Sequence, residues 1–196
     1  MPWAHMVGYE GPDDDTALEL DMSLRASSNS HGLPDLQQSI ESYSWVIPSH
    51  EALSSCVRLA KTGKIIEIGS GSGYWTSLLR GYGADVIAVD PHPASRHFIW
   101  DTIRRKGEEY LTDQGGCPDR ALFMCWPRGS FGDKVLQAYN GDTLLWIGEA
   151  QDGWQTTWSL KETRFPDWHL IESIILPSWV GMKPILCMYQ KCGPRA

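Results

Sequence analysis

From residue 48 onward, short apolar runs alternate with amphipathic stretches, and this alternation predicts an α/β domain. Four runs have the length of buried strands: 64–69 (KIIEIG), 84–90 (ADVIAVD), 121–127 (ALFMCWP) and 142–149 (DTLLWIGE). Apolar residues at helical spacing predict helices over 48–62, 74–82 and 131–141. Strands joined by helical crossovers pair in parallel, so we expect a mainly parallel sheet.

The helix over 48–62 also has a start signal. Ser49 stands in the N-cap position, and Leu53, Cys56, Val57 and Ala60 follow at helical intervals. We therefore expect an amphipathic helix that leads into the first strand.

The C-terminal part predicts a different connection. The runs 168–177 (WHLIESIILP) and 183–191 (KPILCMYQK) read as strands, and SWVGM between them is too short for a helical crossover. The expected fold is therefore a doubly wound, mainly parallel seven-stranded sheet that ends in an antiparallel β-hairpin.

Two segments have weaker patterns. Residues 91–120 fit one long helix, or a helix, a short strand around 101–105 and a second helix after Gly107. We favour the second arrangement, because a doubly wound sheet needs a third strand outside the second. Residues 1–40 show little periodicity and predict a loop-rich leader or lid, ahead of one domain over 41–196.

Charge and cysteine content narrow the function. The net charge of −7 disfavours nucleic acid and anionic membranes as partners, and Glu108 and Glu109 compensate the basic run 104–106. Five cysteines form no C-x-x-C pair, so no metal site is expected. Their odd number, and the lack of a basic-then-apolar N-terminal stretch, favour the cytoplasm. No run approaches the roughly 18 apolar residues of a membrane span.

The stretch IIEIGSGSGYW places Gly69, Gly71 and Gly73 directly behind the first predicted strand. In a doubly wound fold this turn faces the ligand, and missing side chains let a ligand approach the backbone. The spacing is G-x-G-x-G, unlike the G-x-G-x-x-G of dinucleotide sites. Glu67 lies in the apolar strand, where a carboxylate needs a donor or cation. Asp90 ends the second strand, where its carboxylate can accept both hydroxyls of a ribose.

The combination of E-x-G-x-G-x-G, an acidic residue after the second strand and a terminal hairpin resembles the class I S-adenosylmethionine-dependent methyltransferases. The resemblance spans roughly residues 45 to 192 and implies S-adenosylmethionine as cofactor and S-adenosylhomocysteine as product. It implies that the glycine turn lies along the methionine part, that Asp90 holds the ribose, and that a residue near Glu108 or Glu109 lies by the adenine. The expected cofactor-binding residues are Glu67, Gly69, Ser70, Gly71, Gly73, Tyr74, Trp75, Asp90 and Trp126.

A narrower resemblance rests on SYSWVIPSHEAL, GYW and CWPRGS. These stretches are similar to a group of small methyltransferase-like proteins with S-W-A-I-P and W-P-P in the same places. This chain departs from W-P-P at Arg128. The run 121–127 is the fourth strand when the short strand around 101–105 is counted. The loop after the fourth strand lines the acceptor pocket in class I enzymes, so the departure at Arg128 implies a different choice of acceptor.

The acceptor site is predicted from tryptophans at the carboxyl edge of the sheet. Ten tryptophans in 196 residues are unusual, and several at one mouth could form a cage for a cation or stack on a flat ring. Filling of the core is the competing explanation, above all for Trp75 and Trp146. The expected acceptor-binding residues are Trp45, Trp126, Pro127, Arg128, Trp146 and Trp179. Trp126 and Glu149 are the catalytic candidates, with His50 a further possible base.

These residues favour methylation of a small molecule, on nitrogen rather than on oxygen or sulfur. Trp126-Pro127 stands where amino-group methyltransferases of DNA and protein have Asp or Asn before two prolines. A tryptophan side chain accepts no hydrogen bond from an amine, which argues against a nucleobase substrate. A non-catalytic module that binds the cofactor or a partner, and a methyltransferase acting on a basic peptide, remain the alternatives.

Overall fold

The computed structural model describes residues 43–95, 98–128, 130–149, 167–177 and 183–192. Trp179 and the predicted leader over 1–40 lie outside them. The described helices are α4 (His50–Leu59), α5 (Tyr74–Gly81), α6 (Gly107–Asp113) and α7 (Phe131–Ala138). The described strands are β1 (Lys64–Ile68), β2 (Asp85–Val89), β3 (Ala121–Cys125), β4 (Thr143–Glu149), β5 (Trp168–Ile175) and β6 (Pro184–Lys191).

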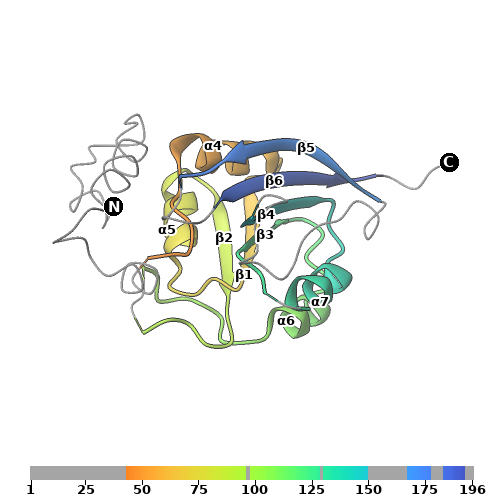
Figure 1. The fold of residues 1–196 in the computed structure, drawn as a ribbon. Helices are drawn as coiled ribbons and strands as arrows, with labels where there is room; N and C mark the ends of the chain where they lie inside the picture. The colour runs from red at the N-terminus through yellow and green to blue at the C-terminus, as the bar shows by residue number, and fades with distance from the viewer. Residues whose placement is uncertain (1–42, 96–97, 129, 150–166, 178–182, 193–196) are drawn as a thin grey trace.

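The strands form one sheet in the order β2-β1-β3-β4-β6-β5 (Figure 1). Strands β2, β1, β3 and β4 pair in parallel, and Glu67 of β1 lies opposite Ala88 of β2 and Phe123 of β3. Strand β6 runs antiparallel to both β4 and β5. The doubly wound sheet and the C-terminal antiparallel hairpin are confirmed. The prediction of seven strands is wrong by one, because the described chain forms six.

The missing strand is the one predicted around 101–105. There the chain makes a single parallel bridge, between Ile103 and Val89, with hydrogen bonds from Ile103 N to Ala88 O and from Asp90 N to Ile103 O. Ile103 is the only apolar residue of 101–106, so a longer edge strand would bury little more apolar surface. The helix predicted ahead of this strand is absent from the described residues there, whereas the helix after Gly107 is confirmed as α6.

Helix α4 begins as its sequence predicts. The side chain of Ser49 accepts a hydrogen bond from the backbone N–H of Ala52 at 3.2 Å, which satisfies one of the free amides of the first turn. Ala52, Leu53 and Cys56 form the buried face. The capped helix thereby places the segment 43–48, directly before it, against the end of the sheet where β1 and β3 stop.

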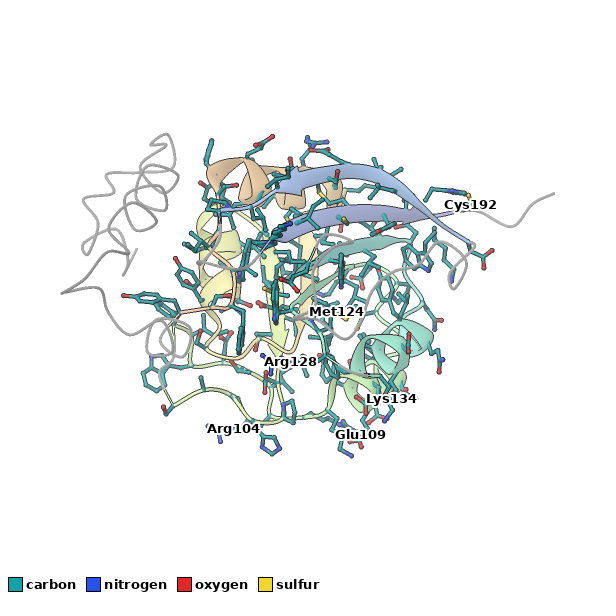
Figure 2. The ribbon with its side chains drawn as sticks, viewed as in Figure 1. Arg104, Glu109, Met124, Arg128, Lys134 and Cys192 are labelled. Carbon is teal, nitrogen blue, oxygen red and sulfur yellow. The ribbon has the colours of Figure 1, made fainter. Side chains whose placement is uncertain are left out.

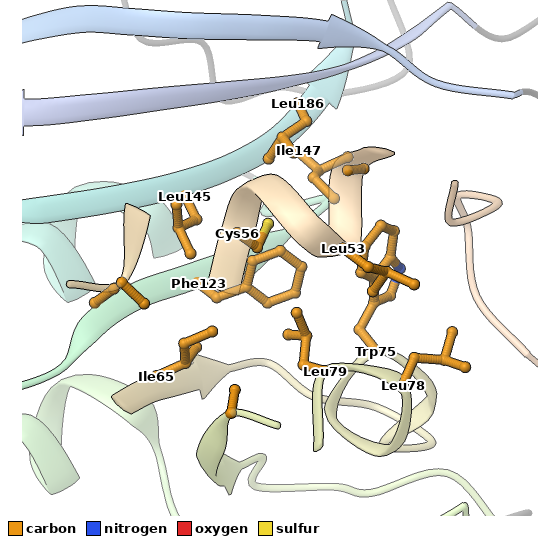
Figure 3. Close-up of a cluster of buried hydrophobic side chains, with 14 of the residues drawn as sticks. Leu53, Cys56, Ile65, Trp75, Leu78, Leu79, Phe123, Leu145, Ile147 and Leu186 are labelled. Atoms are coloured by element: carbon orange, nitrogen blue, oxygen red, sulfur yellow. The ribbon is translucent and has the colours of Figure 1, made fainter. Parts of the chain in front are cut away.

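Helices cover both faces of the sheet, and each face has its own apolar cluster. In Figure 3, α4 and α5 supply Leu53, Cys56, Trp75, Leu78 and Leu79, which pack on sheet residues such as Phe123. The rings of Trp75 and Phe123 are 5.3 Å apart between centroids. The other cluster lies under α6 and α7 and includes Ile66, Met124 and Trp146. Burial of these alternating residues fixes the register of the strands.

The strand order reverses between β1 and β3. The connection after β1 leads through α5 to β2, and the connection after β3 leads through α7 to β4 on the other side. The loops that follow β1 and β3 therefore open on one crevice at the carboxyl edge, the usual ligand position in such sheets. In the described part of the chain, no helix combines the length and apolar character needed to cross a membrane.

Candidate functional site

The turn between β1 and α5 is built from three glycines with positive φ. The φ angles are +82° for Gly69, +55° for Gly71 and +73° for Gly73. Residues with a Cβ rarely adopt this left-handed region. Each glycine of the G-x-G-x-G motif therefore occupies a position whose backbone conformation favours glycine. Gly73 is also the N-cap of α5.

The three glycines differ in what surrounds them. A Cβ on Gly73 would lie 2.3 Å from Cγ1 of Ile99, so Ile99 leaves no room for a side chain at this position. A Cβ on Gly69 would meet the ring of Phe131 at 3.5 Å. No heavy atom of the described chain lies within 4 Å of a Cβ built on Gly71. Of the three, Gly71 therefore leaves space for something other than this chain.

Asp90 holds the glycine turn. Its Oδ2 accepts a hydrogen bond from the N–H of Gly71 at 2.8 Å, and its Oδ1 accepts one from the N–H of His92 at 2.7 Å. A carboxylate has about four acceptor positions, so each oxygen of Asp90 can still accept a second donor. The residue has a structural role in the turn and keeps the capacity to bind hydroxyl groups.

Glu67 is buried beneath the turn, with 2% of its surface exposed. Its carboxyl group accepts a hydrogen bond from the hydroxyl of Thr76 on α5. Burial, with a smaller contribution from the charge of Asp90, raises the pKa of Glu67 to about 8, against the lowering effect of the Thr76 hydrogen bonds. Glu67 is therefore largely protonated at neutral pH. Thr76 supplies the hydrogen-bond donor that the burial of Glu67 in the strand requires.

A pocket of about 210 Å³ lies beside the glycine turn. Its lining combines the turn itself, the segment before α4 and the ends of β1 and β3: Tyr43, Ser44, Trp45, Glu67, Gly69, Ser70, Gly71, Ser72, Tyr74, Trp75, Ala94 and Cys125. The hydroxyl of Ser70 is buried and has no hydrogen-bond partner among the described residues. A ligand in the pocket could supply that partner, since buried polar groups are generally hydrogen-bonded.

The segment Tyr43–Trp45 forms one wall of this pocket. Sequence reasoning predicted Trp45 as a site residue but missed Tyr43 and Ser44. Ser44 Oγ accepts hydrogen bonds from Nε1 of Trp75 at 3.2 Å and from the N–H of Val46 at 3.3 Å. The hydroxyl of Ser72 donates to the carbonyl oxygen of Tyr43 at 2.7 Å. The contacts with Trp75 and Ser72 span 31 and 29 residues of sequence, so no local pattern reveals them; the serine between two aromatic residues is the only signal.

Trp45 and Trp126 are brought together, as predicted for the acceptor site. Their rings are stacked, with centroids 6.4 Å apart and planes 6° from parallel. Arg128 lies on the Trp45 ring, with Cζ 4.2 Å from its centroid. Trp126 follows β3 with a φ of +60° and is 4% exposed, and Pro127 beside it is buried.

Of the remaining predicted residues, the acceptor residue Trp146 and the possible base His50 lie apart from this stack. Trp146 is in the middle of β4 and packs under α6 and α7, whereas Trp126 packs in the cluster on the opposite face. The predicted convergence of these two tryptophans is therefore wrong. Trp146 pairs with Met124 of β3, whereas Trp126, two residues beyond Met124, lies after the end of the strand with a positive φ and packs on the other face. Glu149 ends β4 and is buried. His50 forms a hydrogen bond through Nδ1 with the hydroxyl of Tyr82 at 2.6 Å, away from the pocket lining.

No cluster of three or more His, Cys, Asp or Glu side chains that could hold a metal ion occurs within the described ranges. The polar groups at the site are the backbone of the turn, hydroxyl groups, the protonated carboxyl group of Glu67 and the side chain of Asp90. This set suits an organic ligand with both hydrogen-bond donors and acceptors.

Comparison with known proteins gives no match to a protein-family model and none to a curated protein. Among solved structures, the chain is similar to magnesium protoporphyrin IX methyltransferase from Synechocystis PCC 6803 with bound S-adenosylmethionine, at 10% identity and a TM-score of 0.47, over 93% of this chain and 100% of that one. It is also similar to 1,6-didemethyltoxoflavin-N1-methyltransferase from Burkholderia thailandensis with bound S-adenosylhomocysteine, at 12% identity and a TM-score of 0.47, over 90% of this chain and 87% of that one. At such low scores these likenesses carry no argument about activity or substrate.

Proposed function

We propose that this protein is an S-adenosylmethionine-dependent methyltransferase that acts on a small molecule, with nitrogen as the preferred acceptor atom. The observation that carries the proposal is the glycine turn. Three residues with positive φ are braced by Asp90, and the middle one, Gly71, leaves open space beside a pocket. The resemblance in sequence motif supports the same cofactor.

The residues at the turn fit that cofactor. Asp90 has two remaining acceptor positions for the ribose hydroxyls. The buried hydroxyl of Ser70 lacks a partner in the described chain, and Gly69, Ser70 and Gly71 line the pocket. Tyr74 and Trp75, which follow the turn, are buried and also line the pocket. When bound, the cofactor would supply an electrophilic methyl group on a sulfonium, and S-adenosylhomocysteine would leave as the acceptor's nucleophile attacks that methyl carbon in line.

The chain's own contribution to such a displacement is orientation. Holding a nucleophile in line with the methyl group removes most of the entropic cost of the reaction. Trp45 lines the pocket, and Trp126, in the loop after β3, stacks on Trp45. A base is needed only when the bound nucleophile carries a proton. Glu149, which ends β4 and is buried, is our candidate for that role, and Trp126 is our candidate for positioning the acceptor.

Transfer of labelled methyl groups from S-adenosylmethionine tests the proposal. The purified protein is incubated with cofactor and a cell extract separated by molecular mass, and label is expected in the low-mass fraction. Label only in the peptide fraction, with salt-sensitive turnover, would instead indicate a protein methyltransferase. Cofactor binding without any labelled product would indicate a non-catalytic module.

Replacement of Trp126 tests the acceptor site separately. We expect Trp126→Ala to reduce methyl transfer far more than it weakens the binding of S-adenosylhomocysteine, because Trp126 contacts Trp45 and does not line the pocket at the turn. An equal loss of both would contradict the assignment of this tryptophan to the acceptor.

The extract should be prepared under reducing conditions, because all five cysteines are free thiols and we place the protein in the cytoplasm.

A further inference from the structure

We infer that Arg128 recognises an anionic oxygen group, a carboxylate or a phosphate, on a planar methyl acceptor. The inference rests on the proposed function and deepens it, since it concerns the same site. The first support is the stack itself. The guanidinium of Arg128 lies over the ring of Trp45, with Cζ 4.2 Å from the ring centroid, and the rings of Trp45 and Trp126 are stacked nearly parallel. A guanidinium that lies on an aromatic face is held in orientation while its N–H groups point outward in its own plane.

The charge of Arg128 is not neutralised by the described chain. Arg58, Arg80, Arg105 and Arg120 each form an ion pair with a carboxylate. Within the described residues no carboxylate lies within 4 Å of the Arg128 guanidinium, and its side chain is exposed. In Figure 2 Arg128 is seen below Met124, whereas Arg104 lies at the lower margin of the molecule. Arg128 follows the carboxyl end of β3 by three residues. The position of Arg128, rather than its exposure alone, therefore suits it to a ligand.

Trp126 adds a second unsatisfied donor. Its side chain is 4% exposed, and its Nε1 has no hydrogen-bond acceptor in the part of the chain that the structure describes. Its φ of +60° is unusual for a residue with a large side chain, and such strained backbone conformations concentrate at functional sites. Arg128 and Trp126 both offer only donors through their side chains. A group with acceptors alone, such as a carboxylate or phosphate, complements both.

The pocket is compatible with an anion. Trp45 belongs to both the stack and the pocket lining, so it connects the two. Glu67 is the only acidic residue among the described residues of the lining, and burial raises its pKa to about 8, so it repels an anion little at neutral pH. Arg128 already places a positive charge on the face of Trp45, which disfavours a cationic ligand there. Of the two ligands expected for an aromatic cage, the cation is therefore the less compatible.

The test uses three aromatic probes on the full-length protein saturated with S-adenosylhomocysteine. Anthranilate carries a carboxylate, phenyl phosphate carries a phosphate, and 2-aminobenzamide is a neutral analogue of the first. Binding is followed through the indole N–H signals in a ¹H–¹⁵N NMR spectrum, assigned with Trp45→Phe and Trp126→Phe. We expect at least one anionic probe to shift both signals saturably and to bind at least tenfold more tightly than the amide. The better of the two anionic probes tells a carboxylate from a phosphate.

Two matched variants locate the effect. Arg128→Gln should abolish the preference for the anionic probe, whereas Arg104→Gln, the other arginine without an ion pair in the described chain, should leave it unchanged. Both side chains are exposed, so both variants should fold. Equal binding of the acids and the amide, no binding of either acid, or an equal loss in both variants would overturn the inference. A wild-type protein that does not bind S-adenosylhomocysteine would instead refute the proposed function, so the two failures are distinguishable.

Discussion

Gly71→Ala tests whether the glycine turn exists for a ligand. The φ of Gly71 is +55°, and no heavy atom of the described chain lies within 4 Å of the added Cβ. The substitution therefore introduces backbone strain without a clash inside the protein. Gly83, between α5 and β2, is a matched control, since its φ is +92° and its Cβ would also meet no described atom within 4 Å.

The magnitudes follow from these geometries. A residue with a Cβ in the left-handed region costs about 1–2 kcal/mol, so both variants should lose a similar free energy of unfolding. In a domain of this size that loss lowers Tm by roughly 2–8 °C. Gly73→Ala should be less stable than either, because its Cβ would lie 2.3 Å from Ile99 Cγ1. If the open space at Gly71 belongs to the cofactor, Gly71→Ala should also weaken binding at least tenfold, about 1.4 kcal/mol.

Thermal unfolding and calorimetric titration with S-adenosylhomocysteine measure the two effects on the same samples. We expect Gly71→Ala and Gly83→Ala to have similar Tm values, and only Gly71→Ala to bind more weakly. Wild-type affinity in a folded Gly71→Ala protein would refute the argument, because the glycine would then serve only the conformation of the turn.

Three further predictions concern the buried polar groups around the pocket and the core. The raised pKa of Glu67, about 8 against 4.5 as its ordinary value, means that the folded protein binds a proton the unfolded chain releases, so urea unfolding should show stability decreasing from about pH 5 to pH 8. Glu67→Gln should flatten that slope, and an unchanged slope would contradict the assignment. Ser44→Ala should cost about 1–3 kcal/mol in the same assay, because it leaves Nε1 of the buried Trp75 without its acceptor. Tyr139→Phe should cost about 1–3 kcal/mol through the loss of its hydrogen bond to the carbonyl oxygen of Thr143, with unchanged binding of S-adenosylhomocysteine; weaker binding would show that the two regions are coupled.

The elements that sequence reasoning predicted well have strong local signals. Helix α4 carries a capping serine and an apolar face, and β1 to β4 are continuous apolar runs, so pattern alone locates them. The predicted strand around 101–105 failed because a single apolar residue, Ile103, can anchor one bridge and no more. The prediction there came from the expected sheet and not from the residues themselves.

The candidate site also contains residues that local sequence predicts and contacts that it does not predict. The glycine turn, Glu67 and Asp90 are close in sequence to the strands that position them, and their placement at one edge follows from the order of the elements. The contact of Ser44 with Trp75 depends on packing between distant segments. The positive φ of Trp126 is equally hidden, because no sequence pattern predicts this conformation for a tryptophan. Contacts of this kind require the folded chain.

The most direct test of the proposed function is calorimetric titration of the wild-type protein with S-adenosylhomocysteine, beside Asp90→Asn and Asp142→Asn. The amide introduced by Asp90→Asn would keep one acceptor oxygen, whereas the wild-type carboxylate bonds two backbone N–H groups and has capacity for ribose hydroxyls. Asp142, which precedes β4 and pairs with Lys61, lies at the opposite edge of the sheet. The proposal predicts saturable binding by the wild type and the Asp142 variant, and at least tenfold weaker binding by the Asp90 variant. A folded wild-type protein that does not bind S-adenosylhomocysteine would contradict it.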